Sequence, residues 1–197
     1  MILGITGSFG CGKSAVLSIF AARNWRTADA DRICHELYDA PPPELTAALR
    51  GRWAERPFDT SGRIERSKLA GIVFADPVEL EALTALVYPL LNRKLDDFIA
   101  CCRRDDADAA IEIPLLYETG FENKFDRTVA VWAAPELRRR RLCERRHFTP
   151  ENIADRERRQ LAPDLKLERA DAGLINNGTR AELERQIDRL INQLKVR

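Results

Sequence analysis

Residues 4–14 read GITGSFGCGKS, and they carry the residue types that hold a phosphate group in proteins. The segment from Gly7 to Ser14 matches the pattern G-x-x-x-x-G-K-[ST] in full, between an apolar run and a helix-forming segment. Its glycines let backbone N–H groups turn inward around an anion, and the following helix N-terminus adds partial positive charge. Lys13 is placed to reach the β and γ phosphates, and the Ser14 hydroxyl to ligate Mg²⁺. The segment therefore predicts binding of a nucleoside triphosphate.

A cysteine, Cys11, lies inside this phosphate-binding loop (P-loop). Thiolate chemistry is one interpretation. A small residue that contributes only its backbone N–H is the interpretation we favour. The chain has five cysteines without paired metal-ligand spacing, which is typical of reduced, mostly buried thiols in a cytoplasmic protein.

Candidate acceptor-side residues follow the second predicted strand, in Asp29-Ala30-Asp31. Ligands of open α/β sheets bind at strand ends, where two carboxylates can orient Mg²⁺ and accept a proton from a substrate hydroxyl. Asp31 is equally suited to cap the helix that follows, so the residues alone leave both interpretations open. His35 falls one turn into that helix, where a packing role is the commoner one.

Further candidates come later in the chain. Glu112 ends a predicted strand and is either an outer-shell acid near Mg²⁺ or, as we favour, a residue at a polar edge of the sheet. Leu115 follows it in the segment IPLLYE. Tyr88-Pro89 is expected to open a helix, with Tyr88 lining a pocket or simply packing.

Residues 138–146 read RRRRLCERR. A nucleic-acid patch is one interpretation, but on a helix these arginines point in several directions. We favour arginines that clamp a triphosphate when a lid closes, with Arg141 and Arg145 four apart on one face. A solvated helix with internal ion pairs is the alternative.

The elements that must position these residues alternate along the chain. Strands are predicted at 1–6, 26–30, 109–113, 128–133 and 172–176, several of them apolar throughout, as in parallel sheets buried on both faces. Helix starts are predicted at Asp76-Pro77, Thr149-Pro150 and Thr179-Arg180. The stretch between the second and third strands has helical periodicity only. The pattern predicts a doubly wound α/β fold with a helical insertion at one edge of the sheet.

Composition limits the classes of function. The 197 residues are 45% hydrophobic and 32% charged with a formal net charge of +1, as in an ordinary globular enzyme. Near-zero net charge gives no support for bulk attraction to nucleic acid or anionic membrane. No apolar run approaches the ~20 residues of a membrane span, and no signal peptide is expected.

The ordered motifs of the chain resemble those of the dephospho-coenzyme A kinase family, from residue 1 to about 190. They are GITGSFGCGKS, DADRICHELY, TSGRIERSKLAGIVFADP, VYPLLNRKL, IPLLYETG, RRRRLCERRHFTPENIADRERRQ and ADAGLINNGT. The resemblance implies ATP-dependent phosphorylation of the 3′-hydroxyl of dephospho-CoA, giving CoA and ADP, the last step of CoA synthesis. It also implies a P-loop kinase core with a five-stranded parallel sheet (1–39 and 105–197). The same resemblance implies a helical lid at about 138–165 and a helical insertion that binds the CoA moiety (40–104).

The resemblance also implies site residues. Asp31 would be the general base, and Arg141, assisted by Arg145, would reach the phosphates from the lid. Asn177 and Gly178 would lie near the adenine. Lys13 would take part in catalysis, Ser14 would bind Mg²⁺, and the ATP phosphates would be held by Gly10, Cys11, Gly12, Lys13, Ser14 and Ala15. Substrate contacts are expected from Asp29, His35, Tyr88 and Leu115.

The expected partners are therefore ATP with Mg²⁺ and dephospho-CoA, without nucleic acid or membrane, in a monomer or small homo-oligomer. Two rivals stay open. One is another small-molecule P-loop kinase, which predicts a shorter acceptor domain without the DAD and YPLL segments. The other is a nucleotide-dependent regulatory protein acting on nucleic acid, which predicts a basic surface. A degenerate kinase is disfavoured because Lys13, Ser14 and Asp31 are all present.

Overall fold

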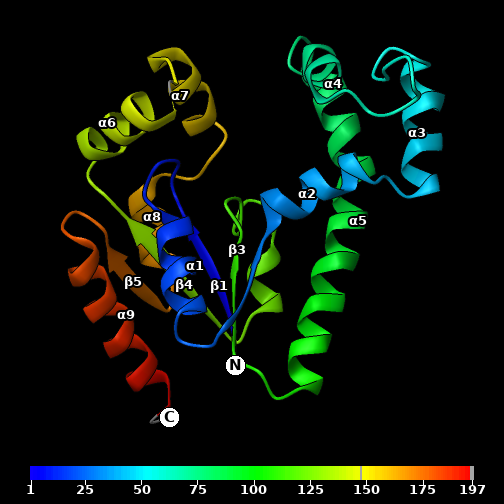
Figure 1. The fold of residues 1–197 in the computed structure, drawn as a ribbon. Helices are drawn as coiled ribbons and strands as arrows, with labels where there is room; N and C mark the ends of the chain where they lie inside the picture. The colour runs from blue at the N-terminus through cyan, green and yellow to red at the C-terminus, as the bar shows by residue number, and fades with distance from the viewer. Residues whose placement is uncertain (147, 196–197) are drawn as a thin grey trace. The chain divides into compact units, whose positions relative to one another are not determined.

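The computed structural model describes residues 1–146 and 148–195 (Figure 1). The chain forms two compact units. The first consists of Met1–Asp29 and Cys101–Arg197, and the second of Ala30–Ala100. The predicted helical insertion, 40–104, falls mostly within the second unit, which also includes the helix after the second strand.

The first unit is built on one five-stranded sheet, in which all pairs of neighbouring strands are parallel. The strand order is β2-β3-β1-β4-β5, so β1 lies in the centre between β3 and β4. The predicted strands are confirmed to within a residue or two. Their bounds are β1 Ile2–Gly7, β2 Arg26–Asp29, β3 Ala109–Glu112, β4 Arg127–Trp132 and β5 Ala172–Ile175.

Helices cover both faces of this sheet (Figure 1). Alternate residues of β1, including Leu3 and Ile5, form one buried cluster with α1 (Lys13–Ala21) and α9 (Arg180–Lys195). The opposite face is covered by α8 (Pro163–Arg169), where Leu167 lies against Gly173 of β5. The remaining helices of this unit are η1 Phe121–Lys124, α6 Pro135–Arg146 and α7 Pro150–Glu157.

The second unit is helical, and its described residues contain no strand beyond an isolated bridge between Phe58 and Ile64. Its own apolar cluster includes Leu45, Leu49 and Trp53. It contains α2 Ala30–Asp39, α3 Pro43–Trp53, α4 Arg66–Val73 and most of α5 Pro77–Arg104. The helical periodicity predicted for this stretch is confirmed by these four helices.

The prediction that Tyr88-Pro89 opens a helix is wrong. α5 runs without interruption from Pro77 to Arg104, with Pro89 in its interior. An interior proline removes one helical hydrogen bond and crowds the preceding turn. Burial of Val87, Leu90 and Leu91 on either side of it offsets that cost.

The three predicted helix starts are confirmed, with one difference in the capping contacts. Thr149 accepts a hydrogen bond from the Asn152 N–H at the start of α7. Asp76 accepts one from the Val78 N–H at the start of α5. Glu79, however, does not reach back to the cap, because its carboxylate accepts hydrogen bonds from Arg52 and Trp53.

No helix within residues 1–146 and 148–195 is both long enough and apolar enough to cross a bilayer.

The start of α9 is capped by two reciprocal hydrogen bonds, whose contribution to stability can be tested. The Thr179 hydroxyl accepts the Glu182 N–H at 3.3 Å, and the Glu182 carboxylate accepts the Thr179 N–H at 2.7 Å. Thr179→Ala removes one half of this reciprocal cap and should lower the free energy of unfolding by about 1 kcal/mol. Urea unfolding of the unliganded protein measures the change. Thr179→Ser keeps the hydroxyl and should stay close to wild type; equal losses in both variants would contradict a capping role.

Candidate active site

The P-loop connects the carboxyl end of β1 to the amino end of α1. Gly12 precedes α1 with φ of 96°, in the left-handed region that favours glycine, and no described side chain caps the helix by a hydrogen bond. The N–H groups at a helix N-terminus lack intrahelical acceptors. The amides at the start of α1 are therefore available to an anion, whose charge the helix dipole favours.

Two positions of the loop require glycine because neighbouring side chains lie too close for a Cβ, as well as because of their backbone conformation. A Cβ at Gly10, where φ is 79°, would lie 2.9 Å from Leu142 on α6. A Cβ at Gly12 would lie 2.2 Å from the side-chain amide nitrogen of Asn176. The loop is therefore enclosed between α6 and the end of β5, with no room for larger residues.

Lys13 is buried beneath the loop, with a relative exposure of 7%. Its ammonium donates to the backbone oxygens of Gly7 at 3.0 Å and Ser8 at 3.3 Å. It also lies 3.7 Å from the Glu112 carboxylate. A buried ammonium is tolerated only with such partners. The cation is thus held at the position from which it can meet phosphate oxygens.

Glu112 lies in the centre of this site, and the sheet order explains why. β3 pairs directly with β1, which places Glu112 opposite Ile5, two residues before the P-loop. The Ser14 hydroxyl, at the exposed side of the loop, donates to the Glu112 carboxylate at 3.5 Å. Glu112 therefore lies beside the P-loop, at the place where an outer-shell acid near Mg²⁺ is expected; its role stays a prediction.

Asn176, which the sequence did not single out, fastens the loop to β5. Its buried side-chain amide donates to the Cys11 carbonyl at 2.8 Å. Its own backbone carbonyl accepts from the Arg141 guanidinium at 3.0 Å. Arg141 therefore does lie beside the P-loop, as expected of a clamp. The repeated asparagine of INNGT was the available signal, but it did not distinguish the first residue from the second.

Arg138 was also missed, because the arginine run offered no way to tell which member turns inward. Its side chain is buried, and its guanidinium donates to the Phe9 carbonyl at 3.2 Å and to Glu157 of α7 at 2.6 Å. Arg138 thus joins both lid-region helices to the backbone of the P-loop. The side chain of Arg145 lies outside the described residues.

The aromatic residue of the loop contacts the same region. The Phe9 ring packs edge-on against Phe148, with centroids 5.1 Å apart. The Arg156 guanidinium lies 5.0 Å from the Phe9 centroid and 5.1 Å from the Phe148 centroid. The segment from α6 to α7 is therefore seated on the P-loop by apolar and cation–π contacts as well as by Arg138.

The expected substrate residues divide between the two units. Asp29 ends β2 beside Glu112 in the first unit, where half-buried Leu115 also lies. Asp31 and His35 lie on α2 with exposed side chains, and Tyr88 is half-buried on α5, all in the second unit. Because α2 begins at Ala30, Asp31 lies in its first turn, and the capping interpretation of Asp31 is wrong.

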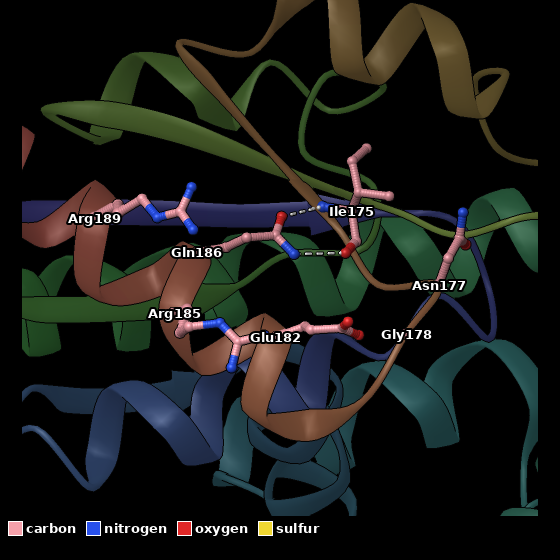
Figure 2. A pocket seen from close by; sticks show the side chains of 7 residues that line it. All are labelled: Ile175, Asn177, Gly178, Glu182, Arg185, Gln186 and Arg189. Atoms are coloured by element: carbon pink, nitrogen blue, oxygen red, sulfur yellow. Dashed lines mark hydrogen bonds between the residues drawn. The ribbon is translucent and has the colours of Figure 1, made fainter.

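Asn177 and Gly178, the expected adenine neighbours, lie exposed after β5. They line an open hollow of about 340 Å³ together with residues of α9 (Figure 2). Figure 2 shows Gln186 reaching from α9 to the backbone of Ile175, with hydrogen bonds of 2.9 Å and 2.8 Å. Gln186 therefore occupies the backbone N–H and carbonyl of Ile175, at the end of this edge strand.

Cys11 is fully buried, and burial raises the pKa of its thiol. A raised pKa keeps the sulfur protonated and unreactive. Of the two interpretations of Cys11, the one in which the backbone matters is the better supported. Its carbonyl accepts from Asn176 and its amide donates to Ser8.

A parallel sheet, a glycine loop on its central strand, a buried lysine, and a carboxylate beside a serine hydroxyl together define a P-loop phosphotransferase. Arginines from a separate helical segment complete this arrangement.

Comparison with known proteins gives the particular family. The family model for dephospho-CoA kinase matches residues 1–193. A dephospho-CoA kinase of Agrobacterium fabrum is 34% identical over 98% of both chains. One of Deinococcus radiodurans is 34% identical over 98% of this chain and 92% of its own. A solved structure from Thermus thermophilus, 33% identical over 98% and 97% of the two chains, superposes with a TM-score of 0.81.

The chain therefore belongs to the dephospho-CoA kinase family, as its motifs predicted. It is a transferase that phosphorylates dephospho-CoA with ATP as donor, in the final step of CoA biosynthesis. The fold agrees with that of a Campylobacter jejuni dephospho-CoA kinase, at 23% identity and a TM-score of 0.74 over 98% and 96% of the two chains. The rival interpretations, a different kinase and a nucleic-acid regulator, are superseded by this membership.

The Asn176 contact yields a test of how the loop is held. Asn176→Ala leaves the Cys11 carbonyl without its donor in a buried place and should cost about 1–3 kcal/mol of stability. ATP should also bind at least about fivefold more weakly, because the loop loses its support. That factor corresponds to a loss of about 1 kcal/mol in binding free energy, since 1.4 kcal/mol is tenfold in affinity. Calorimetric titration with ATP measures the change, with Asn192→Ala, at an exposed position of α9, as the comparison. Unaltered ATP affinity in Asn176→Ala would show that the loop holds its shape without this hydrogen bond.

Proposed function

We propose that the residues around the P-loop carry out the family reaction in the roles that follow. The observation that supports this proposal is the Glu112 carboxylate, which lies 3.7 Å from the Lys13 ammonium and 3.5 Å from the Ser14 hydroxyl at the N-terminus of α1. The backbone amides from Gly10 to Ala15 bind the β and γ phosphates of ATP. Lys13 follows the transferred phosphoryl group and balances the charge that develops on its oxygens.

The donor set fits Mg²⁺. Ser14 offers a hydroxyl and Glu112 a carboxylate, and oxygen ligands are those that Mg²⁺ prefers. Within residues 1–146 and 148–195 there is no cluster of three or more His, Cys, Asp or Glu that could enclose a metal. That agrees with an ion bound mainly by nucleotide phosphates and water. Ser14 would hold the ion, with Glu112 next to it, and the ion would neutralise phosphate charge.

Asp31 is proposed as the general base that accepts the proton of the 3′-hydroxyl. Its support is the family motif DAD and its exposed position in the first turn of α2. Asp29, at the end of β2 beside Glu112, is proposed to orient the acceptor. The helical unit Ala30–Ala100 is proposed to hold the remainder of dephospho-CoA, with contacts from His35 and Tyr88.

Arg141 is proposed to reach the ATP phosphates from the lid, together with Arg145. The proximity of Arg141 to Gly12 supports this role, since a Cβ there would lie 3.9 Å from its guanidinium. Asn177 and Gly178 are proposed to border the adenine, and Leu115 the acceptor. The lid at about 138–165 is proposed to exclude water when it closes.

We propose that the protein acts in the cytoplasm without nucleic acid or membrane partners, as a monomer or small homo-oligomer. The five cysteines support a reducing compartment, since all are free thiols.

The activity is tested by ADP release from the purified protein with Mg²⁺ and ATP, with and without dephospho-CoA. We expect release that depends on dephospho-CoA, with CoA as the product. AMP, adenosine and gluconate serve as comparison acceptors, because they present related hydroxyls. Stimulation by one of these and none by dephospho-CoA would contradict the proposed acceptor.

The assignment of Asp31 is tested by Asp31→Asn, which removes the proton acceptor and preserves shape. We expect kcat to fall about 100-fold or more while the ATP dissociation constant changes less than threefold. Lys13→Ala, in contrast, should weaken both ATP binding and transfer. Turnover of Asp31→Asn at the wild-type rate would refute the base, whatever the outcome for Lys13.

A further inference from the structure

A second buried lysine, Lys166, lies in the first unit and has no role in the reaction as described so far. It is on α8, and its side chain is 1% exposed. Removing an ammonium from water costs several kcal/mol, so the fold must give it close partners. Burial lowers the pKa of Lys166, while the hydrogen bond and charge of Glu118 oppose that shift.

Both partners belong to the segment that follows β3. The Lys166 ammonium donates to the Pro114 carbonyl at 2.5 Å and lies 2.8 Å from the Glu118 carboxylate. The lysine therefore fastens the turn after Glu112 to α8 at two points, Pro114 and Glu118.

The Pro114 carbonyl connects Lys166 to the P-loop strand. It also accepts from the Thr6 hydroxyl at 3.4 Å, and Thr6 immediately precedes Gly7. The intervening Ile113 N–H donates to the Ile5 carbonyl at 2.8 Å. The two residues after Glu112 are thus fixed against β1, and their position determines where the Glu112 carboxylate meets Lys13 and Ser14.

The Glu118 carboxylate connects Lys166 to the lid region. The oxygen nearest the ammonium also accepts the Leu161 N–H at 2.7 Å. Leu161 lies between α7 and α8, where the chain returns from the lid helices to the core. One ammonium therefore holds both the acid-bearing strand end and the return of the lid.

We infer that Lys166 is a positioning residue for phosphoryl transfer, acting by fixing Glu112 beside the P-loop and Leu161 at the base of the lid. This inference rests on the proposed roles of Lys13 and Glu112. The hydrogen bond and ion pair of Lys166 go to Pro114 and Glu118, so its removal should disturb the geometry of transfer more than the binding of ATP.

The first test is Lys166→Met, which keeps the length of the side chain and removes the charge. We expect kcat per folded molecule to fall about 10- to 100-fold, since misplacing reacting groups by about 1 Å has an effect of that size. The ATP dissociation constant, measured by calorimetry, should stay within threefold of wild type. Thermal unfolding gives the folded fraction by which each rate is corrected.

A second variant separates positioning from stability, because Lys166→Met leaves Glu118 without its cation. In the double variant Lys166→Met with Glu118→Gln, no unpaired charge remains, and the glutamine oxygen can still accept the Leu161 N–H. Stability should recover relative to Lys166→Met, since replacing both members of a buried pair is far milder than removing one. The kcat should stay low, because Pro114 and Leu161 are still not joined.

A control removes a different and more exposed ion pair of the same unit. Arg26 and Asp105 form a 2.7 Å pair at the amino end of β2, away from the carboxyl ends of the strands. Arg26→Met with Asp105→Asn should leave kcat within twofold of wild type.

Three outcomes would overturn the inference. The first is a kcat of the double variant within twofold of wild type. The second is a loss of activity in Lys166→Met that only follows its unfolded fraction. The third is ATP binding that is more than tenfold weaker in Lys166→Met with kcat unchanged. Failure of the proposed site is recognised separately, because Lys13→Ala would then be fully active whatever Lys166 does.

Discussion

The central constraint on this protein is the buried ammonium of Lys13, which needs partners in the fold that still leave its charge available to phosphate. Lys13 lies beneath the P-loop at the N-terminus of α1, where a helix dipole of the same sign adds to its potential. Its partners are two loop carbonyls and the Glu112 carboxylate at 3.7 Å. The distance to Glu112 is longer than that of a tight ion pair, and a phosphate oxygen would offer the ammonium a stronger, charged acceptor.

The strand order supplies those partners from distant parts of the chain. Because β1 lies between β3 and β4, its P-loop is flanked by residues from both halves of the sheet. Glu112 comes from β3, and Asn176 from the end of β5. The latter occupies the space beside Gly12, which explains why a Cβ cannot be accommodated there. The glycine pattern is thus a consequence of packing around the loop as much as of backbone conformation.

The P-loop and the five strands could be predicted because their signals are local: a glycine spacing in one case, apolar runs in the other. Features that depend on tertiary partners could not. Pro89 indicates a helix boundary by its chemistry, yet Leu90 and Leu91 pack well enough to carry α5 past it. Asp31 resembles a helix cap, but α2 begins one residue earlier.

The inward-facing arginine and the second buried lysine were hidden for a related reason. In RRRRLCERR every arginine has the same local chemistry, and only contact with Phe9 and Glu157 distinguishes Arg138. Lys166 lies in the short, charged segment PDLKLER, where nothing in the local pattern distinguishes it from an exposed lysine. Its burial depends on Pro114 and Glu118, about fifty residues earlier, and no periodicity encodes such a pairing.

The two buried lysine–glutamate pairs described above, Lys13–Glu112 and Lys166–Glu118, differ in a way that suits transfer chemistry. Lys13 and Glu112 lie 3.7 Å apart and each has other polar contacts, so their partners can change when phosphates bind. Lys166 and Glu118 are 2.8 Å apart and bind backbone groups at Pro114 and Leu161, so they hold one arrangement. An exchangeable pair works only if its surroundings stay fixed while it exchanges. The permanent pair supplies that rigidity, because it joins the residues after Glu112 to the base of the lid.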